Sequence, residues 1–170
     1  IVAGGGVRHS DAGKELTRLV EGLNIPVVTS LNGKDTFLST HPLSAGVVGS
    51  YSRASANRTI GEADLVCFVG SKTGGMTTHF WQVPAPGIDA IQIDIEPAEI
   101  GRNYPLKAAV QGDAKTVLSA MAEMMDKETA NIRTAWTTRM QTIASEWQTE
   151  YEPLLTSDAV PIRPERMCRD

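Results

Sequence analysis

The sequence predicts an α/β domain built around a parallel β-sheet. Short apolar runs alternate with segments whose apolar residues recur at helical spacing, and this alternation is typical of parallel sheets with helical crossovers. The run at residues 65–69, Leu-Val-Cys-Phe-Val, is apolar at every position, as in a strand buried on both faces. With 170 residues, of which 41% are hydrophobic, the chain is long enough for one domain with a core and too short for two full ones.

Five short runs bounded by glycine, proline or polar residues are expected to form strands. These expected strands are residues 1–3, 25–29, 65–69, 90–95 and 107–111. Two long segments rich in glycine and proline, residues 30–50 and 70–87, are expected to be loops. Loops of this length inside a domain are usually functional.

Apolar residues at helical spacing predict helices in the segments between the strands. The expected helices are residues 10–22, 52–62, 97–100, 112–125 and 127–152. The last helix carries an apolar stripe that we interpret as helix core, and its members are Ile132, Trp136, Met140, Ile143, Trp147 and Tyr151. Beyond it, Pro153, Pro161 and Pro164 are expected to break the chain into a linker-like tail.

The composition argues against two classes of partner. The formal net charge is −4, whereas non-specific nucleic-acid binding depends on a basic surface. The longest strongly apolar run, residues 65–69, is far shorter than the roughly 20 residues that span a bilayer. No signal peptide is recognisable, so we expect a cytoplasmic protein. The chain begins with Ile1 inside an apparent strand, and we therefore expect it to be a fragment of a longer protein.

No metal site is expected from the cysteines and histidines. Cys67 and Cys168 are too few for a disulfide framework or a four-ligand zinc site. The histidines show no metal-ligand spacing with one another or with the cysteines, and they are His9, His41 and His79. Two free thiols fit a reducing compartment.

Gly4, Gly5 and Gly6 follow the first expected strand and are the first candidate for a phosphate-binding turn. Glycines let the backbone approach a pyrophosphate, and a following helix N-terminus favours negative charge. The NAD fingerprint is incomplete, because His9 stands where its third glycine would lie and Thr29-Ser30 replaces the acidic residue after the second strand. The turn is therefore either a phosphate site or a tight strand–helix connection, and both interpretations stay open.

Two aspartates follow neighbouring expected strands, at the edge where parallel sheets bind ligands. Asp94 lies in Ile-Asp-Ile-Glu-Pro and Asp113 in Gly-Asp-Ala. Each carboxylate could accept a hydrogen bond from a ribose or an adenine amino group, or it could cap the turn or helix that follows. Ser71-Lys72 could be a nucleophile and its base, but nothing in the sequence orients such a pair.

An ordered set of motifs resembles the central domain of thiamine-diphosphate (ThDP)-dependent enzymes of the acetolactate synthase type, which include oxalyl-CoA decarboxylase and benzaldehyde lyase. The resemblance covers about residues 1–125. Its motifs are Asn32-Gly33-Lys34, His41-Pro42-Leu43, Gly46-Val47-Val48-Gly49, Ala63-Asp64-Leu65-Val66, Val69-Gly70-Ser71-Lys72, the segment Ile-Asp-Ile-Glu-Pro-Ala-Glu-Ile-Gly-Arg-Asn-Tyr-Pro at residues 93–105, and Gly112-Asp113-Ala114.

The resemblance implies a Rossmann-like middle domain of about six parallel strands in an enzyme of three α/β domains. ThDP and Mg²⁺ would be bound by the flanking catalytic domains, which also supply the catalytic glutamate and the Gly-Asp-Gly…Asn motif. No Gly-Asp-Gly occurs here, so we expect no catalytic residue in this chain. The parent would be a homo-oligomeric lyase or transferase acting on 2-oxo acids or related carbon–carbon bonds.

The family's middle domain binds FAD in some members, ADP in others and nothing in the rest. Carried over by motif, the residues implied to meet a nucleotide are Gly4, Gly5, Gly6, Ser71, Lys72, Asp94, Ile95, Asp113 and Ala114. Two departures count against FAD. FAD-binding acetolactate synthases usually carry Gly-Met-His-Gly where this chain has Gly46-Val47-Val48-Gly49, and an arginine with Phe-Asp-Asp where it has Lys72-Thr73-Gly74-Gly75.

The sequence thus predicts a central, nucleotide-binding-like domain at residues 1–126, an amphipathic helix at 127–152 and a linker at 153–170 that leads towards an absent diphosphate-binding domain. The leading hypothesis is a middle domain with an ADP or FAD site. The alternatives are a structural domain that orients its catalytic neighbours and binds no ligand, and a stand-alone NAD-dependent oxidoreductase.

Overall fold

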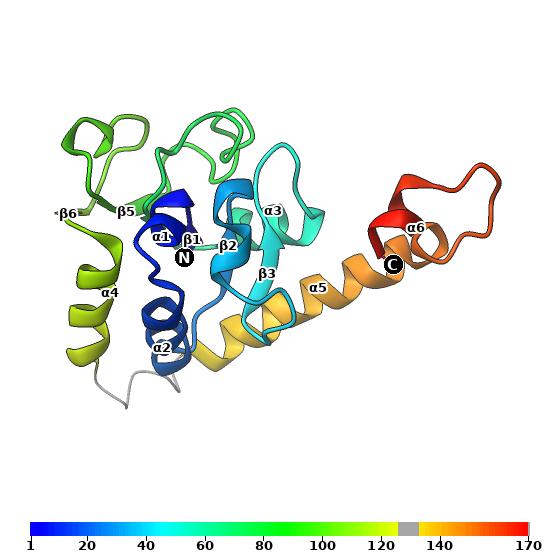
Figure 1. The fold of residues 1–170 in the computed structure, drawn as a ribbon, viewed down its shortest axis with the longest axis horizontal. Coiled ribbons are helices and arrows are strands. Elements are labelled where there is room, and N and C mark those ends of the chain that lie inside the picture. Colours follow the sequence, from blue (N-terminus) through cyan, green and yellow to red (C-terminus); the bar gives the residue numbers. More distant parts are fainter. Residues whose placement is uncertain (126–132, 170) are drawn as a thin grey trace.

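The computed structural model describes residues 1–125 and 133–169 and contains a six-stranded sheet in which all strand pairs are parallel (Figure 1). The strands are β1 (Val2–Ala3), β2 (Val27–Thr29), β3 (Ser44–Val47), β4 (Leu65–Val69), β5 (Asp89–Asp94) and β6 (Ala108–Gln111). Their order across the sheet is β3-β2-β1-β4-β5-β6. The strand order reverses between β1 and β4, which is the position where open α/β sheets form a crevice at the carboxyl ends of their strands. The predicted α/β class is confirmed.

Helices cover both faces of this sheet. They are α1 (Gly5–His9), α2 (Gly13–Leu23), α3 (Ala54–Gly61), α4 (Ala114–Glu123), α5 (Thr134–Leu155) and α6 (Pro164–Arg169), with the 3₁₀ turns η1 (Leu31–Thr36) and η2 (Pro97–Glu99). Neighbouring residues of one strand enter different cores, as strand geometry requires. Ala3 packs with α1, α2 and α4, whereas Val2 packs with α3 and α5.

Strand β3 was not among the five expected strands. It lies with the turn η1 in residues 30–50, which we expected to be a loop, so the prediction is wrong for these two elements. The Ser30 hydroxyl caps η1 by accepting the Gly33 amide at 3.2 Å. β3 reads Ser-Ala-Gly-Val and carries Gly46 at φ +101°, opposite a register shift at Val27/Val28. Such a short, glycine-containing strand has no apolar periodicity for a sequence argument to detect.

The first helical segment also differs from the prediction of one helix at 10–22. Instead, α1 begins within the glycine turn and ends at His9, and α2 starts at Gly13. Asp11 separates them with a left-handed φ of +51°. Short polar residues tolerate this conformation better than most, so the break is encoded locally.

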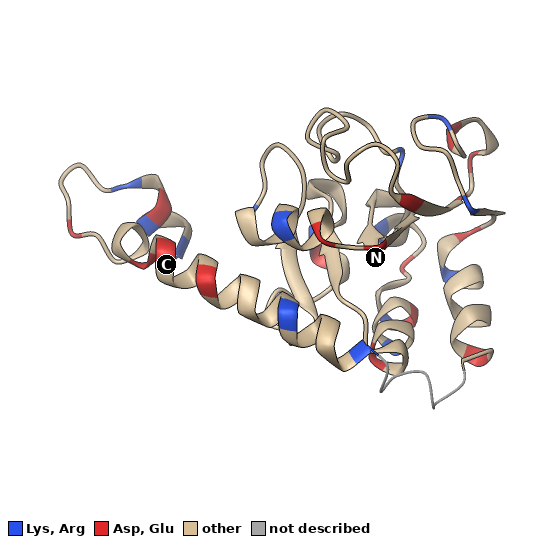
Figure 2. Ribbon diagram, turned by 180° about the vertical axis from the view of Figure 1, so that it is seen from behind, with Lys and Arg blue, Asp and Glu red and all other residues tan. Residues whose placement is uncertain are grey.

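Helix α5 packs on the sheet with its first half and projects beyond it with its second half (Figure 1). Met140 and Ile143 of the predicted stripe are buried, Trp136 and Trp147 are half-buried, and Ile132 lies outside the described residues. Residues of both charge signs are spread along the helix (Figure 2). Two ion pairs tie it to α3 and to the residue that follows α3, namely Arg58–Glu150 at 2.8 Å and Arg139–Glu62 at 2.6 Å.

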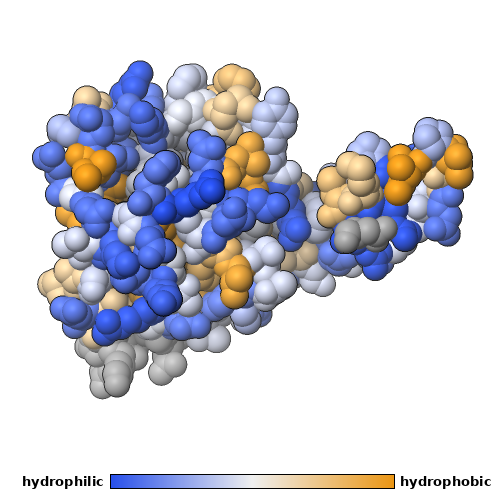
Figure 3. Space-filling view, in the orientation of Figure 1, coloured by the Kyte–Doolittle hydropathy of each residue, from blue (hydrophilic) through white to orange (hydrophobic). Residues whose placement is uncertain are grey.

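The C-terminal tail is more helical than the prediction of a linker at 153–170. Pro153 stays inside the last turn of α5, and Pro164 begins α6, a position that suits proline because its missing amide would have no helical partner. Apolar side chains gather on this projecting part of the molecule (Figure 3), where Val160, Ile162 and Met167 are exposed. Among the described residues, no helix is both long and apolar enough to span a bilayer.

We predict that Gly4→Ala destabilises the domain by about 1–3 kcal/mol, because overpacking a rigid contact has that cost. A Cβ on Gly4 would lie 2.2 Å from the Gly70 carbonyl oxygen, which belongs to backbone and cannot rotate away. Urea unfolding measures the effect. Gly61→Ala is the matched control, because a Cβ there meets nothing within 4 Å, and removing a helical glycine should stabilise the protein by about 0.5–1 kcal/mol. Equal stability of the two variants would contradict the backbone contact.

Candidate nucleotide crevice

A crevice of about 210 Å³ opens at the carboxyl ends of β4, β5 and β6, beside α1 and the start of α4. Its lining residues are Gly6, His9, Ser10, Gly70, Ile93, Asp94, Ile95, Gly112, Asp113 and Ala114. Five of the residues predicted for a nucleotide site therefore lie together, namely Gly6, Asp94, Ile95, Asp113 and Ala114. The crevice is smaller than the roughly 300–1,000 Å³ of pockets for drug-sized ligands, so it suits one part of a nucleotide and not a whole dinucleotide.

The glycine turn is packed against the loop that follows β4. The Gly4 amide donates to the Val69 carbonyl at 2.8 Å, and the Gly6 amide donates to the Gly70 carbonyl at 2.9 Å. A Cβ on Gly6 would approach the Gly70 Cα to 2.6 Å, and Gly70 itself has a left-handed φ of +56°. Two of the turn's three glycine amides are therefore committed to protein, and the glycines have a packing role whether or not a phosphate binds.

Gly4 and Gly5 do not line the crevice. Gly4 is buried, and a Cβ on Gly5 would lie 3.3 Å from the Asn32 Cβ on η1. The Gly5 carbonyl instead contacts His9, whose Nδ1 lies 2.6 Å from it.

Asp94 ends β5 and is 92% buried, with 8% of its surface exposed. Its Oδ1 accepts the Glu96 amide at 3.0 Å, and the Glu96 carboxylate in turn accepts the Ala98 amide at 3.2 Å. Asp94 therefore closes the turn into η2, while its second carboxylate oxygen accepts no hydrogen bond from any described residue. Ile95, the next residue, is 67% exposed beside it, so the crevice combines a carboxylate with an apolar side chain.

Asp113 is the N-cap of α4. Its Oδ1 accepts the Thr116 amide at 3.0 Å and the Thr116 hydroxyl at 3.2 Å. The Gly112 amide donates to the Asp94 backbone carbonyl at 3.0 Å, and this bond fixes the two strand ends beside each other. The capping interpretation of Asp113 therefore applies, and Oδ2 accepts no hydrogen bond from the described residues.

Ser71 and Lys72 do not line the crevice. Ser71 is buried, and its hydroxyl accepts the Thr73 amide at 3.4 Å. The Lys72 side chain is 77% exposed, and its Nζ lies 3.8 Å from the Glu99 carboxylate. Neither residue is oriented as a nucleophile with its base.

The sequence argument missed three residues that shape this region. His9 and Ser10 line the crevice one turn after the glycines, and the Ser10 hydroxyl donates to the Gly6 carbonyl at 2.8 Å. Gln92 is buried in β5, where its amide donates to the carbonyls of Ser71 and Glu99 and accepts the Gly101 amide. Because His9 and Ser10 follow a glycine turn, the sequence could have placed them near the site. A single glutamine in a strand, such as Gln92, gives no such indication.

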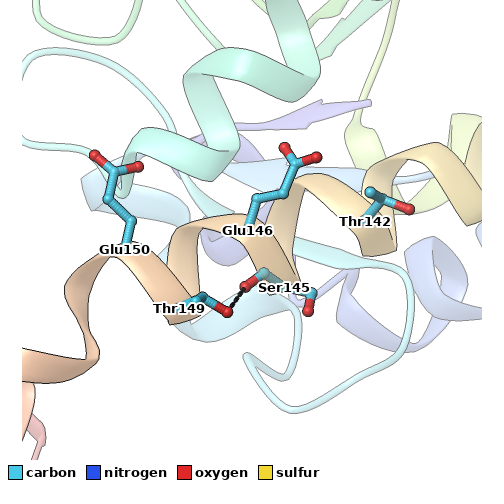
Figure 4. Close-up of a pocket in the computed structure, with 5 residues that line it drawn as sticks. All are labelled: Thr142, Ser145, Glu146, Thr149 and Glu150. Atoms are coloured by element: carbon cyan, nitrogen blue, oxygen red, sulfur yellow. Dashed lines mark hydrogen bonds between the residues drawn. The ribbon is translucent and has the colours of Figure 1, made fainter.

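A hollow on helix α5 lacks the strand-end setting of this crevice. Figure 4 shows a shallow hollow on α5, lined by Thr142, Ser145, Glu146, Thr149 and Glu150. The carboxylates of Glu146 and Glu150 are engaged by Arg139 and Arg58, and the Thr149 hydroxyl donates to the Ser145 carbonyl of its own helix at 3.1 Å. Within residues 1–125 and 133–169, no group of three potential metal ligands comes together.

We predict that Asp113→Ala lowers the free energy of unfolding by about 1 kcal/mol, the typical value for loss of an N-cap side chain. Asp113→Asn is the matched control and should change it little, because asparagine caps helices as well as aspartate does. Thermal or urea unfolding measures both. A full-size loss in Asp113→Asn would show that the charge, and not the cap, stabilises this end of α4.

Comparisons with known proteins agree with this fold. The family described as "Thiamine pyrophosphate enzyme, central domain" matches residues 1–121. A Methanocaldococcus jannaschii protein named "Probable acetolactate synthase large subunit" is 38% identical over the whole chain, which corresponds to 28% of that relative. The Escherichia coli acetolactate synthase isozyme 3 large subunit is 33% identical over 77% of the chain and 23% of its own length.

A solved structure supports the same assignment. The X-ray structure of a Mycobacterium smegmatis protein assigned to the thiamin diphosphate-dependent enzymes superposes with a TM-score of 0.57 and 26% identity. The match covers 74% of this chain and 24% of that one. The chain spans only about a quarter of the length of these relatives. It belongs to the thiamine pyrophosphate enzyme central-domain family and is similar to acetolactate synthase large subunits.

Proposed function

We propose that the crevice beside Asp94 binds the adenylate part of a nucleotide, as ADP or as the ADP half of FAD, within a larger ThDP-dependent enzyme. The main support for this proposal is that five residues predicted to contact a nucleotide line one cavity at the ends of β5 and β6. Crevices at this edge of an open parallel sheet are the general ligand sites of such folds.

The chemistry of the lining suits adenine or ribose. A carboxylate is an acceptor with no donor, and both the adenine amino group and ribose hydroxyls are donors. Among the described residues, Asp94 and Asp113 each accept hydrogen bonds through Oδ1 alone, which leaves their Oδ2 atoms for a ligand. The exposed side chain of Ile95 offers apolar contact to a flat base.

In this proposal the chain contributes no catalytic residue. ThDP and Mg²⁺ would be held by the flanking catalytic domains of the complete protein, which would act on the carbon–carbon bond of a 2-oxo acid. No cofactor chemistry is assigned to the described residues, which gather no potential metal site. The central domain would bind its nucleotide and hold the catalytic domains apart at a fixed distance.

ADP is favoured over FAD. Gly46 and Val47 form part of β3, and the loop after β4 carries Lys72-Thr73-Gly74-Gly75, both of which depart from the FAD-binding pattern. Thr73 in this loop is bonded to Asn103, whose side-chain amide donates to the Thr73 carbonyl at 3.3 Å and to the Thr73 hydroxyl at 3.0 Å.

We predict that ADP binds to the complete protein and that Asp94→Asn weakens binding by about 10- to 100-fold, since a hydrogen bond to a charged group contributes about 1.5–3 kcal/mol. Asparagine can keep the Oδ1 contact to Glu96, so the turn is preserved. Isothermal titration calorimetry with ADP and with FAD measures both affinities.

Asp64→Asn is the matched control for charge. Asp64 is exposed at the opposite, amino-terminal edge of the sheet, just before β4. It should leave binding unchanged. The proposal is contradicted if neither nucleotide binds, or if both variants lose affinity equally.

A second candidate is a ligand-free structural domain that orients the catalytic domains. It is favoured by the amides of Gly4 and Gly6, which are already bonded to β4 and its loop, and by the capping roles of Asp94 and Asp113. Absence of ADP and FAD binding, together with full activity of the complete Asp94→Asn enzyme, would support it.

The residues at the end of β2 argue against the third hypothesis, a stand-alone NAD-dependent oxidoreductase. β2 ends at Thr29, followed by Ser30, and both are buried. The Ser30 hydroxyl caps η1, so no carboxylate stands where the ribose of a dinucleotide is usually held.

A further inference from the structure

The side-chain donors that line the crevice beside Asp94 are committed to protein. The Ser10 hydroxyl donates to the Gly6 carbonyl at 2.8 Å, and the His9 Nδ1 lies 2.6 Å from the Gly5 carbonyl. No lysine or arginine is among the described residues that line the crevice. As long as the histidine ring is neutral, these side chains therefore offer a ligand acceptors and no free donor.

The backbone amides of the lining glycines are committed as well. The Gly6 amide donates to the Gly70 carbonyl at 2.9 Å. The Gly70 amide donates in turn to the Ile93 carbonyl at 2.8 Å, and the Gly112 amide donates to the Asp94 carbonyl at 3.0 Å. Phosphates are bound by donors and cations, so the crevice is poorly suited to the phosphate end of a nucleotide. It suits a part of the ligand that brings its own donors.

Three side-chain acceptors of the crevice receive no hydrogen bond from the described residues. They are Oδ2 of Asp94, Oδ2 of Asp113 and Nε2 of His9. They do not form a metal site, because no three potential metal ligands come together within residues 1–125 and 133–169. Separate acceptors fit a ligand with several donors at separate positions, and adenosine has such donors in its two ribose hydroxyls and its adenine amino group.

The position of the proton on the His9 ring follows from its partner. A backbone carbonyl only accepts hydrogen bonds, so the proton of the neutral ring lies on Nδ1, next to the Gly5 carbonyl. Nε2, on the other side of the ring, then carries a lone pair and is an acceptor. His9 is exposed at the end of the short helix α1, so a ligand can reach this atom.

We propose that His9 is a specificity-determining residue of the crevice, and that its Nε2 accepts a hydrogen bond from a ribose hydroxyl of the bound nucleotide. This inference rests on the proposed function, because it assigns a role within the same site. Asp94 and Asp113 then accept the remaining donors of the adenosine. The site prefers ribonucleotides over deoxyribonucleotides, since an analogue that lacks the hydroxyl leaves Nε2 without a partner.

Two substitutions separate the ligand contact of His9 from its contact with Gly5. In His9→Asn the amide nitrogen takes the place of Nδ1 and can keep the bond to the Gly5 carbonyl, but no atom reaches the position of Nε2. In His9→Gln the longer side chain brings an amide oxygen, which is an acceptor, to the position of Nε2. A role towards the ligand is therefore rescued by glutamine and not by asparagine, whereas a role limited to helix α1 gives the reverse order.

Isothermal titration calorimetry on the complete protein compares ADP with 2′-deoxy-ADP and 3′-deoxy-ADP at pH 8, where histidine rings in general are neutral. We expect one of the two analogues to bind about 3- to 10-fold more weakly than ADP, the effect of one uncharged hydrogen bond. In His9→Asn, ADP should weaken by about that factor and the difference from the analogue should disappear, because the same interaction is lost only once. His9→Gln should restore both.

Arg8→Gln is the matched control. Arg8 is exposed on the same helix and is not among the residues that line the crevice, so the ratio of ADP affinity to deoxy-ADP affinity should stay unchanged. The inference is overturned if His9→Asn leaves the ratios for both analogues unchanged. It is also overturned if His9→Gln or Arg8→Gln alters a ratio as much as His9→Asn does.

The loss of ADP affinity in Asp94→Asn separates this inference from the proposed function. If Asp94→Asn weakens ADP binding while His9→Asn changes neither the affinity nor the ratios, the nucleotide site stands and the role of His9 is refuted. If the unaltered complete protein binds no ADP, both are refuted.

Discussion

The backbone-to-backbone contact between the β1–α1 turn and the loop after β4 is the constraint on which the rest of the structure depends. Gly4, Gly6 and Gly70 meet at distances that no side chain allows, and the amides of Gly4 and Gly6 bond across the contact. This contact lies at the point where the strand order reverses. It holds Gly6 against Gly70, and both residues line the crevice beside Asp94.

The same two aspartates serve the structure and the proposed site. Asp94 and Asp113 each use one carboxylate oxygen to close a turn or cap a helix, and the Gly112 amide fixes the two residues beside each other. This use orders the carboxylates before any ligand arrives, and groups that are already ordered lose less entropy on binding. Capping and binding are therefore compatible roles for one aspartate, since a carboxylate has two oxygens.

The sequence predicted the parts of the fold that carry strong periodicity. The apolar run at β4 and the amphipathic spacing of α2 are visible because burial on both faces, or on one stripe, dictates residue type. β3 was missed because its Ser-Ala-Gly-Val sequence is fixed by pairing with β2 and not by its own pattern. The approach of Asp94 to Asp113 was predictable from the rule for strand ends, whereas the buried hydrogen bonds of Gln92 depend on loops that only the tertiary structure brings together.

In the proposed function the bond-making chemistry belongs to the flanking domains of the complete protein, and the crevice is the candidate ligand site of this chain. A crystal structure of the complete protein soaked with ADP tests that account most directly. The account predicts electron density for the adenosine moiety between Asp94 and Asp113, with a carboxylate oxygen at hydrogen-bond distance from the base or the ribose. ADP bound elsewhere, or an unchanged crevice at saturating ADP, would contradict it.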